Sequence, residues 1–256
     1  MSERDTDDGL VRAGDLWLAL GLLTRLPLPV QGRVTRGARA AWAWPLAGAL
    51  VGAIGGAVAV VSLAAGLPAM VAAGLAIATT VMVTGAMHED GLADTADGFW
   101  GGWDRARRLE IMRDSHIGTY GVLALIVTVG VKWALLVSLL DMGVAWPAMI
   151  AAAALGRGGM VGLMTALPFA RDDGLARSVG RPTMAIALLA GGLALCCAML
   201  ATGLAGFAAA LAAGTITVVI GWSAHHKIGG QTGDVLGAGQ QLAEIAALTA
   251  LVLLIS

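Results

Sequence analysis

The chain has 256 residues, of which 58% are hydrophobic and only 13% charged, and its mean hydropathy is +0.81. Soluble domains carry about a quarter charged residues, so the composition excludes an ordinary soluble domain and predicts an all-α, polytopic membrane helix bundle. The formal net charge of −1 and the lack of a basic run argue against nucleic acid as a partner. Because no linker divides the chain, we expect residues 1–256 to form one membrane-embedded domain.

The N-terminal third of the chain changes from polar to apolar in three steps. Residues 1–13 are polar and acidic, and we expect a disordered tail there. Residues 14–26 are apolar but too short to cross a bilayer, which predicts an interfacial amphipathic helix that ends before Pro27. Residues 40–87 contain no charged side chain and are long enough for two spans of about 20 residues each, with a turn at 66–68.

Further apolar segments follow, separated by polar loops. With the first two they make seven predicted spans, within a range of six to eight. The later spans are predicted at about residues 119–140 and 144–167, twice within 182–224 with a break near 203–206, and, as a short last span, at 240–256.

The positive charges are distributed unevenly along the chain. If the N-terminus is inside, the long polar segments all lie on one face of the membrane, together with every lysine and arginine except Lys132 and Arg157. This is the positive-inside pattern, so we expect the polar loops to face the cytoplasm. An intramembrane charge is a functional hypothesis by default. Snorkelling to the interface is an equal alternative for Arg157, and we assign no role to Lys132.

A densely acidic segment follows the second predicted span. Residues 88–98 read H-E-D-G-L-A-D-T-A-D-G. Asp90, Asp94 and Asp97 are spaced i, i+4 and i+7, which places them on one face of a helix. Three like charges on one face destabilise a helix unless a cation lies among them, and carboxylate oxygens without cysteine suit a hard ion such as Mg²⁺. The alternative is a solvated acidic helix end.

Two further polar motifs can contribute to a phosphate site. Residues 104–118 place arginines beside acids. These arginines either neutralise phosphate oxygens or form ordinary salt bridges. Within this segment we favour Arg113 and Asp114. Residues 227–238 are rich in glycine and can present backbone N–H groups to an anion, or Asp234 to a cation, with a plain turn as the alternative.

Together these motifs resemble the cobalamin synthase family, whose members are also called adenosylcobinamide-GDP ribazoletransferases. The resemblance is carried by H-E-D-G-L-A-D-T-A-D-G, by D-R followed by I-M-R-D-S-H-I-G, and by G-G-Q-T-G-D-V-L-G-A. It extends nearly from end to end with the spacing kept. The sequence departs from the family pattern at Gln241, where an acid is expected ahead of Glu244.

The resemblance implies a Mg²⁺-dependent membrane transferase of cobalamin biosynthesis. Such an enzyme joins adenosylcobinamide-GDP to α-ribazole or its 5′-phosphate and releases GMP, as a ribose hydroxyl attacks the pyrophosphate. Charge builds on the phosphate and leaving oxygens, so positioned Mg²⁺ and arginine are what the reaction needs. The implied setting is the bacterial inner membrane, with the two substrates and the lipid bilayer as partners. A homo-oligomer or an association with other cobalamin-assembly enzymes is a further expectation.

Roles for individual residues follow from this resemblance. His88 or an aspartate could accept the hydroxyl proton, although a regular helix turns His88 away from the aspartate face. We expect metal ligands at Asp90, Asp94 and Asp97, with Glu89 and Asp234 as further ones, catalytic roles for His88, Asp94, Arg113 and Asp114, and substrate-phosphate contacts from Arg105, Arg113, Thr232 and Gly233.

Two other functions compete with this one. Acid-rich motifs at a membrane surface also occur in CDP-alcohol phosphotransferases, which predicts release of CMP, but the spacing here lacks their pattern. Intramembrane charges also mark transporters, here for a corrinoid or a cation. No inverted repeat or pair of broken helices stands out in the sequence to favour transport.

Overall fold

The computed structural model describes residues 9–28 and 36–255, so residues 1–8 of the expected tail lie outside the described residues. Within the described ranges the chain is helical and forms no sheet, as its composition predicts. Six of the described helices are long and apolar enough to cross a membrane, or seven if one bent pair counts as a single span. The six are α2 (Trp44–Ala64), α6 (Thr119–Asp141), α7 (Ala145–Ala166), α9 (Met184–Thr202), α10 (Ala205–Ile228) and α11 (Gly233–Ile255).

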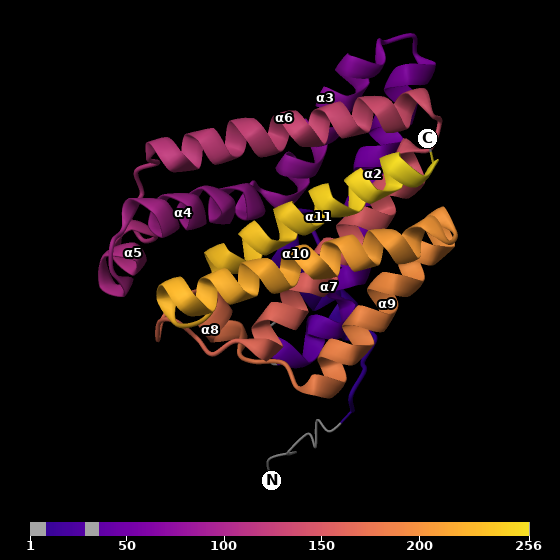
Figure 1. Ribbon diagram of the computed structural model, residues 1–256. Coiled ribbons are helices and arrows are strands. Elements are labelled where there is room, and N and C mark those ends of the chain that lie inside the picture. Colours follow the sequence, from indigo (N-terminus) through magenta and orange to yellow (C-terminus); the bar gives the residue numbers. More distant parts are fainter. Residues whose placement is uncertain (1–8, 29–35, 256) are drawn as a thin grey trace.

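Most predicted span boundaries agree with these helices to within a few residues. The break expected near 203–206 is confirmed, because α9 ends at Thr202 and the next residue, Gly203, has a φ of +63° that stops the helix. α6, α10 and α11 run side by side through the molecule (Figure 1). The all-α, multi-pass architecture is therefore the one that hydropathy predicts.

The predicted start of the last span is wrong. α11 begins at Gly233 and has 23 residues, whereas the sequence suggested a short helix from about residue 240. The polar residues near its start do not end the helix because they face the protein interior. Gln240, Gln241 and Glu244 are each at most 6% exposed.

The second span also differs from its prediction. α3 (Ala69–Thr84) ends before the acidic segment begins. The acidic segment lies in α4 (Met87–Gly101), and the chain bends by 89° between α3 and α4. The two residues between the helices, Gly85 and Ala86, both have positive φ values, of 66° and 57°. This left-handed backbone ends the helical hydrogen-bond pattern of α3 and turns the chain. The acidic segment thus forms a helix of its own, packed against α6 and α11 (Figure 1).

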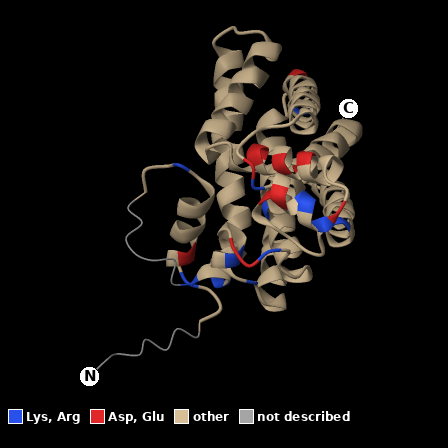
Figure 2. Cartoon of the chain, turned by 90° about the vertical axis from the view of Figure 1, so that its left-hand side faces the viewer, with Lys and Arg blue, Asp and Glu red and all other residues tan. Residues whose placement is uncertain are grey.

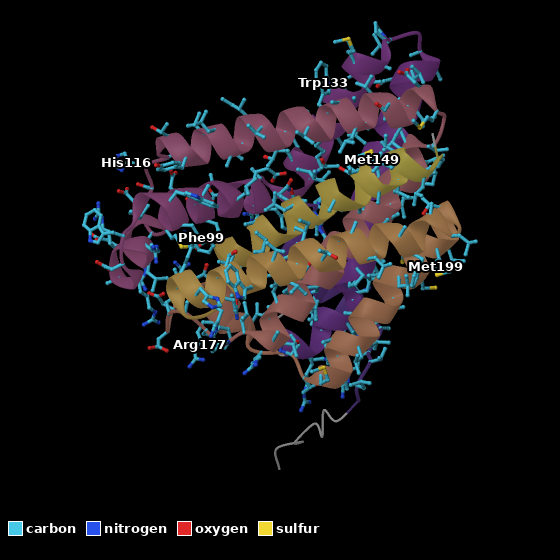
Figure 3. All side chains as sticks on the ribbon, viewed as in Figure 1. Phe99, His116, Trp133, Met149, Arg177 and Met199 are labelled. Carbon is cyan, nitrogen blue, oxygen red and sulfur yellow. The ribbon has the colours of Figure 1, made fainter. Side chains whose placement is uncertain are left out.

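Polar segments collect at one end of the bundle. The short helices α5 (Arg105–Ile111) and α8 (Leu175–Val179) lie at this end, and Figure 2, which looks toward it, shows acidic residues grouped with basic residues beside them. His116 and Arg177 lie on this side of the molecule, whereas Met199 lies on the opposite side (Figure 3). This separation agrees with the predicted distribution of polar loops.

The predicted N-terminal helix is present and is fixed to the bundle. α1 (Gly14–Leu23) contains Asp15, whose carboxylate is fully buried. The guanidinium of Arg36 donates to it at 2.6 Å and the indole of Trp42 donates to it at 2.7 Å. These bonds join α1 to the helical turn η1 (Gly37–Ala43) in front of α2. A buried carboxylate is tolerated because it is paired and hydrogen-bonded.

Candidate active site

The site is built where α4 crosses α11 without side chains between the two backbones. A Cβ atom on Gly91 would lie 2.9 Å from the Asp234 Cα, and one on Gly237 would lie 3.2 Å from the His88 Cα. A side chain at Gly91 would force the two backbones apart, and one at Gly237 would need the His88 backbone to shift by a few tenths of an ångström. The crossing brings Asp90 of α4 and Asp234 in the first turn of α11 to the same cavity.

Carboxylates from both helices lie near this crossing and interact with one another. Asp94 interacts electrostatically with Asp234, Asp90 and Asp97, and with the guanidinium of Arg171. Like charges gathered from two helices repel one another unless a cation lies among them. No three metal-ligating side chains within 9–28 and 36–255 are already arranged around a common point, so ligation by these aspartates stays a prediction.

Arg171 is a site residue that the sequence did not reveal. A parallel bridge pairs Phe169 with Gln231, and the backbone bonds Ala170 N–H to Gln231 O (2.9 Å) and Gln231 N–H to Pro168 O (2.8 Å) hold it. This bridge carries Arg171 to the crossing, where its Nη2 lies 3.3 Å from Asp234 Oδ2. Its Nη1 is buried without a hydrogen-bond partner, which suits a donor aimed at a substrate oxygen.

A cavity of about 150 Å³ opens beside these charges. Asp90, Arg171 and Asp234 form one part of its lining, and the remainder comes from α1, α2, α7 and α8 and from further residues of α4 and α11. Thr232 supports the acidic part, since its hydroxyl donates to Asp234 at 3.1 Å, and Gly233 lies in the wall. The predicted motif at 227–238 is therefore more than a turn between spans.

Asp97 differs from the other aspartates in its hydrogen bonds. Its two carboxylate oxygens accept from the backbone N–H groups of Gly118 (2.7 Å) and Gly121 (2.9 Å) at the start of α6. A carboxylate there satisfies free N–H groups and interacts favourably with the helix dipole. Asp97 is thus placed to hold α6 against α4, and it is a weaker metal candidate than Asp90, Asp94 and Asp234.

The predicted catalytic Asp114 is also remote from the cavity lining. It is exposed and accepts from the backbone N–H of His116 at 3.0 Å, with the ring of His116 at 2.7 Å. These contacts lower the pKa of the Asp114 carboxyl. Asp114 shares a shallow surface pocket with Asp97 and Tyr120. The structure therefore does not bring Asp114 together with Asp90 and Asp234.

The two arginines chosen from the sequence are engaged elsewhere. Arg113 donates to the Asp173 carboxylate at 2.8 Å in an exposed pair. Arg105 donates at 2.8 Å to the carbonyl oxygens of Ile228 and Ala170, which fastens α5 to the end of α10 and to the loop after α7. Arg171 is the better phosphate candidate, because it reaches the cavity and retains an unpaired donor.

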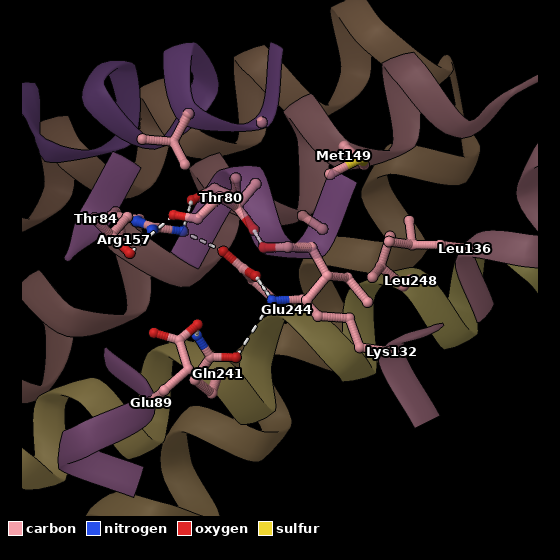
Figure 4. Close-up of a pocket in the computed structure, with 15 residues that line it drawn as sticks. Thr80, Thr84, Glu89, Lys132, Leu136, Met149, Arg157, Gln241, Glu244 and Leu248 are labelled. Atoms are coloured by element: carbon pink, nitrogen blue, oxygen red, sulfur yellow. Dashed lines mark hydrogen bonds and ion pairs between the residues drawn. The ribbon is translucent and has the colours of Figure 1, made fainter. Parts of the chain in front are cut away.

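A second cluster of charges lies deeper, between α6, α7 and α11 (Figure 4). Lys132 Nζ lies 2.5 Å from Glu244 Oε2, and Arg157 pairs with the other oxygen of Glu244. All three side chains are at most 10% exposed, so the snorkelling alternative for Arg157 is wrong. Glu244 sits in the last span, and its pairing accounts for both intramembrane cations.

Glu89 belongs to this deeper cluster and not to the acidic crossing. It accepts from the Gln241 amide at 2.8 Å, and the Gln241 carbonyl oxygen lies 3.3 Å from Lys132 Nζ (Figure 4). On a helix, residue 89 faces away from residues 90 and 94 toward a neighbouring helix. Glu89 is therefore placed to anchor α4 to the bundle, and its predicted role as a metal ligand has no support from these contacts.

Fold and site together define a class of protein: a multi-pass helical membrane protein with carboxylates and an arginine around a cavity at its polar end. The model of the cobalamin-5-phosphate synthase family matches residues 15–252, so the chain belongs to this family. An adenosylcobinamide-GDP ribazoletransferase of Bradyrhizobium diazoefficiens is 45% identical over 240 residues, which are 91% of each chain. That of Brucella anthropi is 42% identical over 94% of this chain and 96% of its own. No solved structure was found to match.

The close approach of α4 and α11 makes a testable prediction. Gly91→Ala is expected to separate the two helices, because the added methyl group would meet the Asp234 backbone oxygen at 2.8 Å. Displacement of Asp90 and Asp94 from Asp234 should reduce product formation by about tenfold or more, since misplacement of about 1 Å can cost 100-fold. Gly130→Ala in α6 is the matched control, because a Cβ there has open space. Equal activity of the two variants would contradict the tight crossing.

Proposed function

We propose that the chain is an adenosylcobinamide-GDP ribazoletransferase, which joins adenosylcobinamide-GDP to α-ribazole or its 5′-phosphate and releases GMP. Its family and the names of its relatives support the overall reaction. The observation that carries the chemistry is that Asp90, Asp234 and Arg171 line one cavity, and that Asp94 interacts electrostatically with all three. Acids and a guanidinium at one point are what transfer of a substituted phosphate needs.

We propose Mg²⁺ as the cofactor, held by Asp90, Asp94 and Asp234. The donor set fits in its chemistry, because it consists of carboxylate oxygens from two helices, and Asp94 interacts electrostatically with both Asp90 and Asp234. When bound, Mg²⁺ would neutralise charge on the pyrophosphate oxygens. The family departure at Gln241 does not affect this set, because Gln241 bonds to Glu89 and Lys132 and not to the three aspartates.

The residues of the chain have distinct roles in the proposed reaction. Arg171 donates from its free Nη1 to a phosphate oxygen and counters the charge that develops there. A ribose hydroxyl attacks the phosphorus atom, the new P–O bond forms as the bond to GMP breaks, and one of the aspartates accepts the hydroxyl proton. Thr232 keeps Asp234 in place through their hydrogen bond.

We further propose that the polar end of the bundle faces the cytoplasm of a bacterial inner membrane. The lysines and arginines of the polar loops support this orientation, and nucleotide substrates are found on that side. A homo-oligomer or an association with other enzymes of the pathway remains compatible with the exposed apolar faces of the spans.

The direct test uses purified protein in a lipid nanodisc with Mg²⁺ and both substrates. We expect release of one GMP for each joined product. CMP release from a CDP-alcohol with no GMP formed, or uptake of unmodified corrinoid into sealed vesicles, would contradict the proposal and favour one of the competing functions.

Two arginine variants test whether Arg171, favoured by the structure, or Arg113, favoured by the sequence, contacts the substrate phosphate. Arg171→Ala is expected to lower the rate of GMP release by about 100-fold, the usual cost of removing a donor to developing charge. Arg113→Ala should change it by less than about threefold, since an exposed ion pair contributes only about 0–1 kcal/mol. Steady-state rates at saturating substrate measure both. The reverse order of effects would restore Arg113 as the phosphate ligand.

A further inference from the structure

The cavity beside the acidic crossing has two chemically different parts. Asp90, Arg171 and Asp234 line the polar part, where the proposed reaction takes place. Apart from His88, the rest of the lining is apolar, and it comes from four other helices as well as from α4 and α11. Its principal side chains are Leu22 and Leu23 of α1, Trp44 of α2, Met160 of α7 and Val179 of α8.

His88 also lines this cavity, and its bonding is unusual. The residue is 1% exposed, and neither ring nitrogen has a hydrogen-bond partner. An unpaired polar group in a buried position is costly, and native proteins rarely leave one without a reason. Both nitrogens are closed off in this structure, and because His88 lines the cavity, a rotation of the ring would present a donor or an acceptor to a molecule that enters it.

The size of the cavity limits what it can hold. Its volume of about 150 Å³ is well below the roughly 300–1,000 Å³ of sites that enclose a drug-sized ligand. A corrin macrocycle is far larger than this space. One fused pair of aromatic rings is of suitable size, and both a purine and a benzimidazole meet that condition.

Polarity separates these two aromatic candidates. Guanine carries several donors and acceptors on its edge, and an apolar wall of leucine, methionine and valine would leave most of them unpaired. The benzimidazole-type base of a ribazole has one free ring nitrogen as its only polar atom. A single imidazole N–H at an otherwise apolar wall matches that pattern.

We propose that this cavity binds the aromatic base of the ribazole substrate, and that His88 donates a hydrogen bond to the free ring nitrogen of that base. This inference rests on the proposed function. His88 and Asp90 are two residues apart on α4 and line one cavity. A base held at His88 therefore leaves its ribose toward Asp90 and Asp234, where the attacking hydroxyl is needed. His88 is then a residue of substrate recognition and not the general base.

The test compares two variants and two ribosides. Met160→Phe narrows the apolar part, and His88→Leu removes the donor. We expect each to raise the KM for α-ribazole 5′-phosphate at least about tenfold and to leave the KM for adenosylcobinamide-GDP within about twofold, because only the riboside contacts these side chains. Met199→Phe, an exposed methionine on α9, is the matched control.

An indole riboside phosphate, which lacks the free ring nitrogen, isolates the hydrogen bond. Calorimetric titration onto wild-type protein without adenosylcobinamide-GDP should show it binding about tenfold more weakly than the benzimidazole riboside, whereas His88→Leu should bind the two equally. If His88→Leu does not fold, the wild-type comparison and Met160→Phe still decide the question.

The outcomes separate failure of this proposal from failure of the proposed function. A raised KM for adenosylcobinamide-GDP in Met160→Phe would assign the cavity to the other substrate, and an unchanged KM for the riboside in a folded variant would also overturn the proposal. If wild-type protein releases no GMP, the proposed reaction fails. The calorimetric titration still tests the cavity in that case, and equal binding of both ribosides would refute the role of His88.

Discussion

Asp94→Asn is expected to lower the rate of GMP release by about 100-fold or more while the protein remains folded. Asp94 interacts with both Asp90 and Asp234, so its carboxylate is central to the proposed metal set. The amide keeps the shape of the side chain but removes the negative charge that a hard cation requires. Removing one of several like charges also relieves repulsion, so unfolding should not become easier. Single-turnover release of GMP, measured across a Mg²⁺ titration, gives the result.

Glu110→Gln is the matched control for this substitution. Glu110 is an exposed acid on α5 that pairs with Arg107, and it lies outside the cavity lining. The same change from carboxylate to amide should leave the rate of GMP release by this variant within about twofold of the wild-type rate, because an exposed ion pair contributes little. If Asp94→Asn retains the wild-type rate and the wild-type dependence on Mg²⁺, Asp94 does not hold the metal.

Glu244→Leu is expected to destabilise the folded protein by about 3–5 kcal/mol, the usual cost of breaking a buried ion pair from one side. Lys132 and Arg157 both depend on the Glu244 carboxylate. Without it, two buried cations in a membrane-spanning region have no counter-charge, which is among the most costly arrangements in such proteins. Equilibrium unfolding in mixed micelles measures the change in the free energy of unfolding.

A triple substitution tests whether charge is the cause. Lys132→Met, Arg157→Met and Glu244→Leu together replace the ionic cluster with apolar side chains of similar size. This triple variant should regain most of the lost stability, because a buried ionic cluster can often be replaced by packed hydrophobic residues. A single Glu244→Leu variant that unfolds at the same denaturant concentration as wild-type protein would contradict the assigned pairing.

Hydropathy was sufficient to predict the main architecture. A stretch without charge that is long enough to span a bilayer has few alternatives to a helix, and for this reason α6 and α7 agree closely with the predicted 119–140 and 144–167. The bend between α3 and α4 could not be predicted in this way. It depends on left-handed backbone at Gly85 and Ala86, and alanine is not a residue that signals such a conformation.

The aspartates of α4 were predicted from local spacing, and Asp234, Thr232 and Gly233 were predicted from the glycine-rich motif at 227–238, whereas Arg171 was not predicted. Asp90 and Asp94 share a helical face, which a four-residue interval indicates directly. The position of Arg171 depends on the bridge between Phe169 and Gln231, residues far apart in the sequence, and no local pattern reports such pairing. A helical wheel likewise groups Asp97 with the other two aspartates. It does not reveal the backbone N–H groups at the start of α6 that occupy both of its oxygens.

The most direct test of the proposed chemistry is an experimental structure with Mn²⁺, in place of Mg²⁺, and GDP, in which anomalous scattering locates the metal. The predicted result is a Mn²⁺ peak bounded by the carboxylates of Asp90, Asp94 and Asp234, with the diphosphate of GDP within hydrogen-bonding distance of Arg171. A metal ion bound at Asp97 and Asp114 instead of these carboxylates, or a diphosphate held by Arg113 and Arg105, would contradict it.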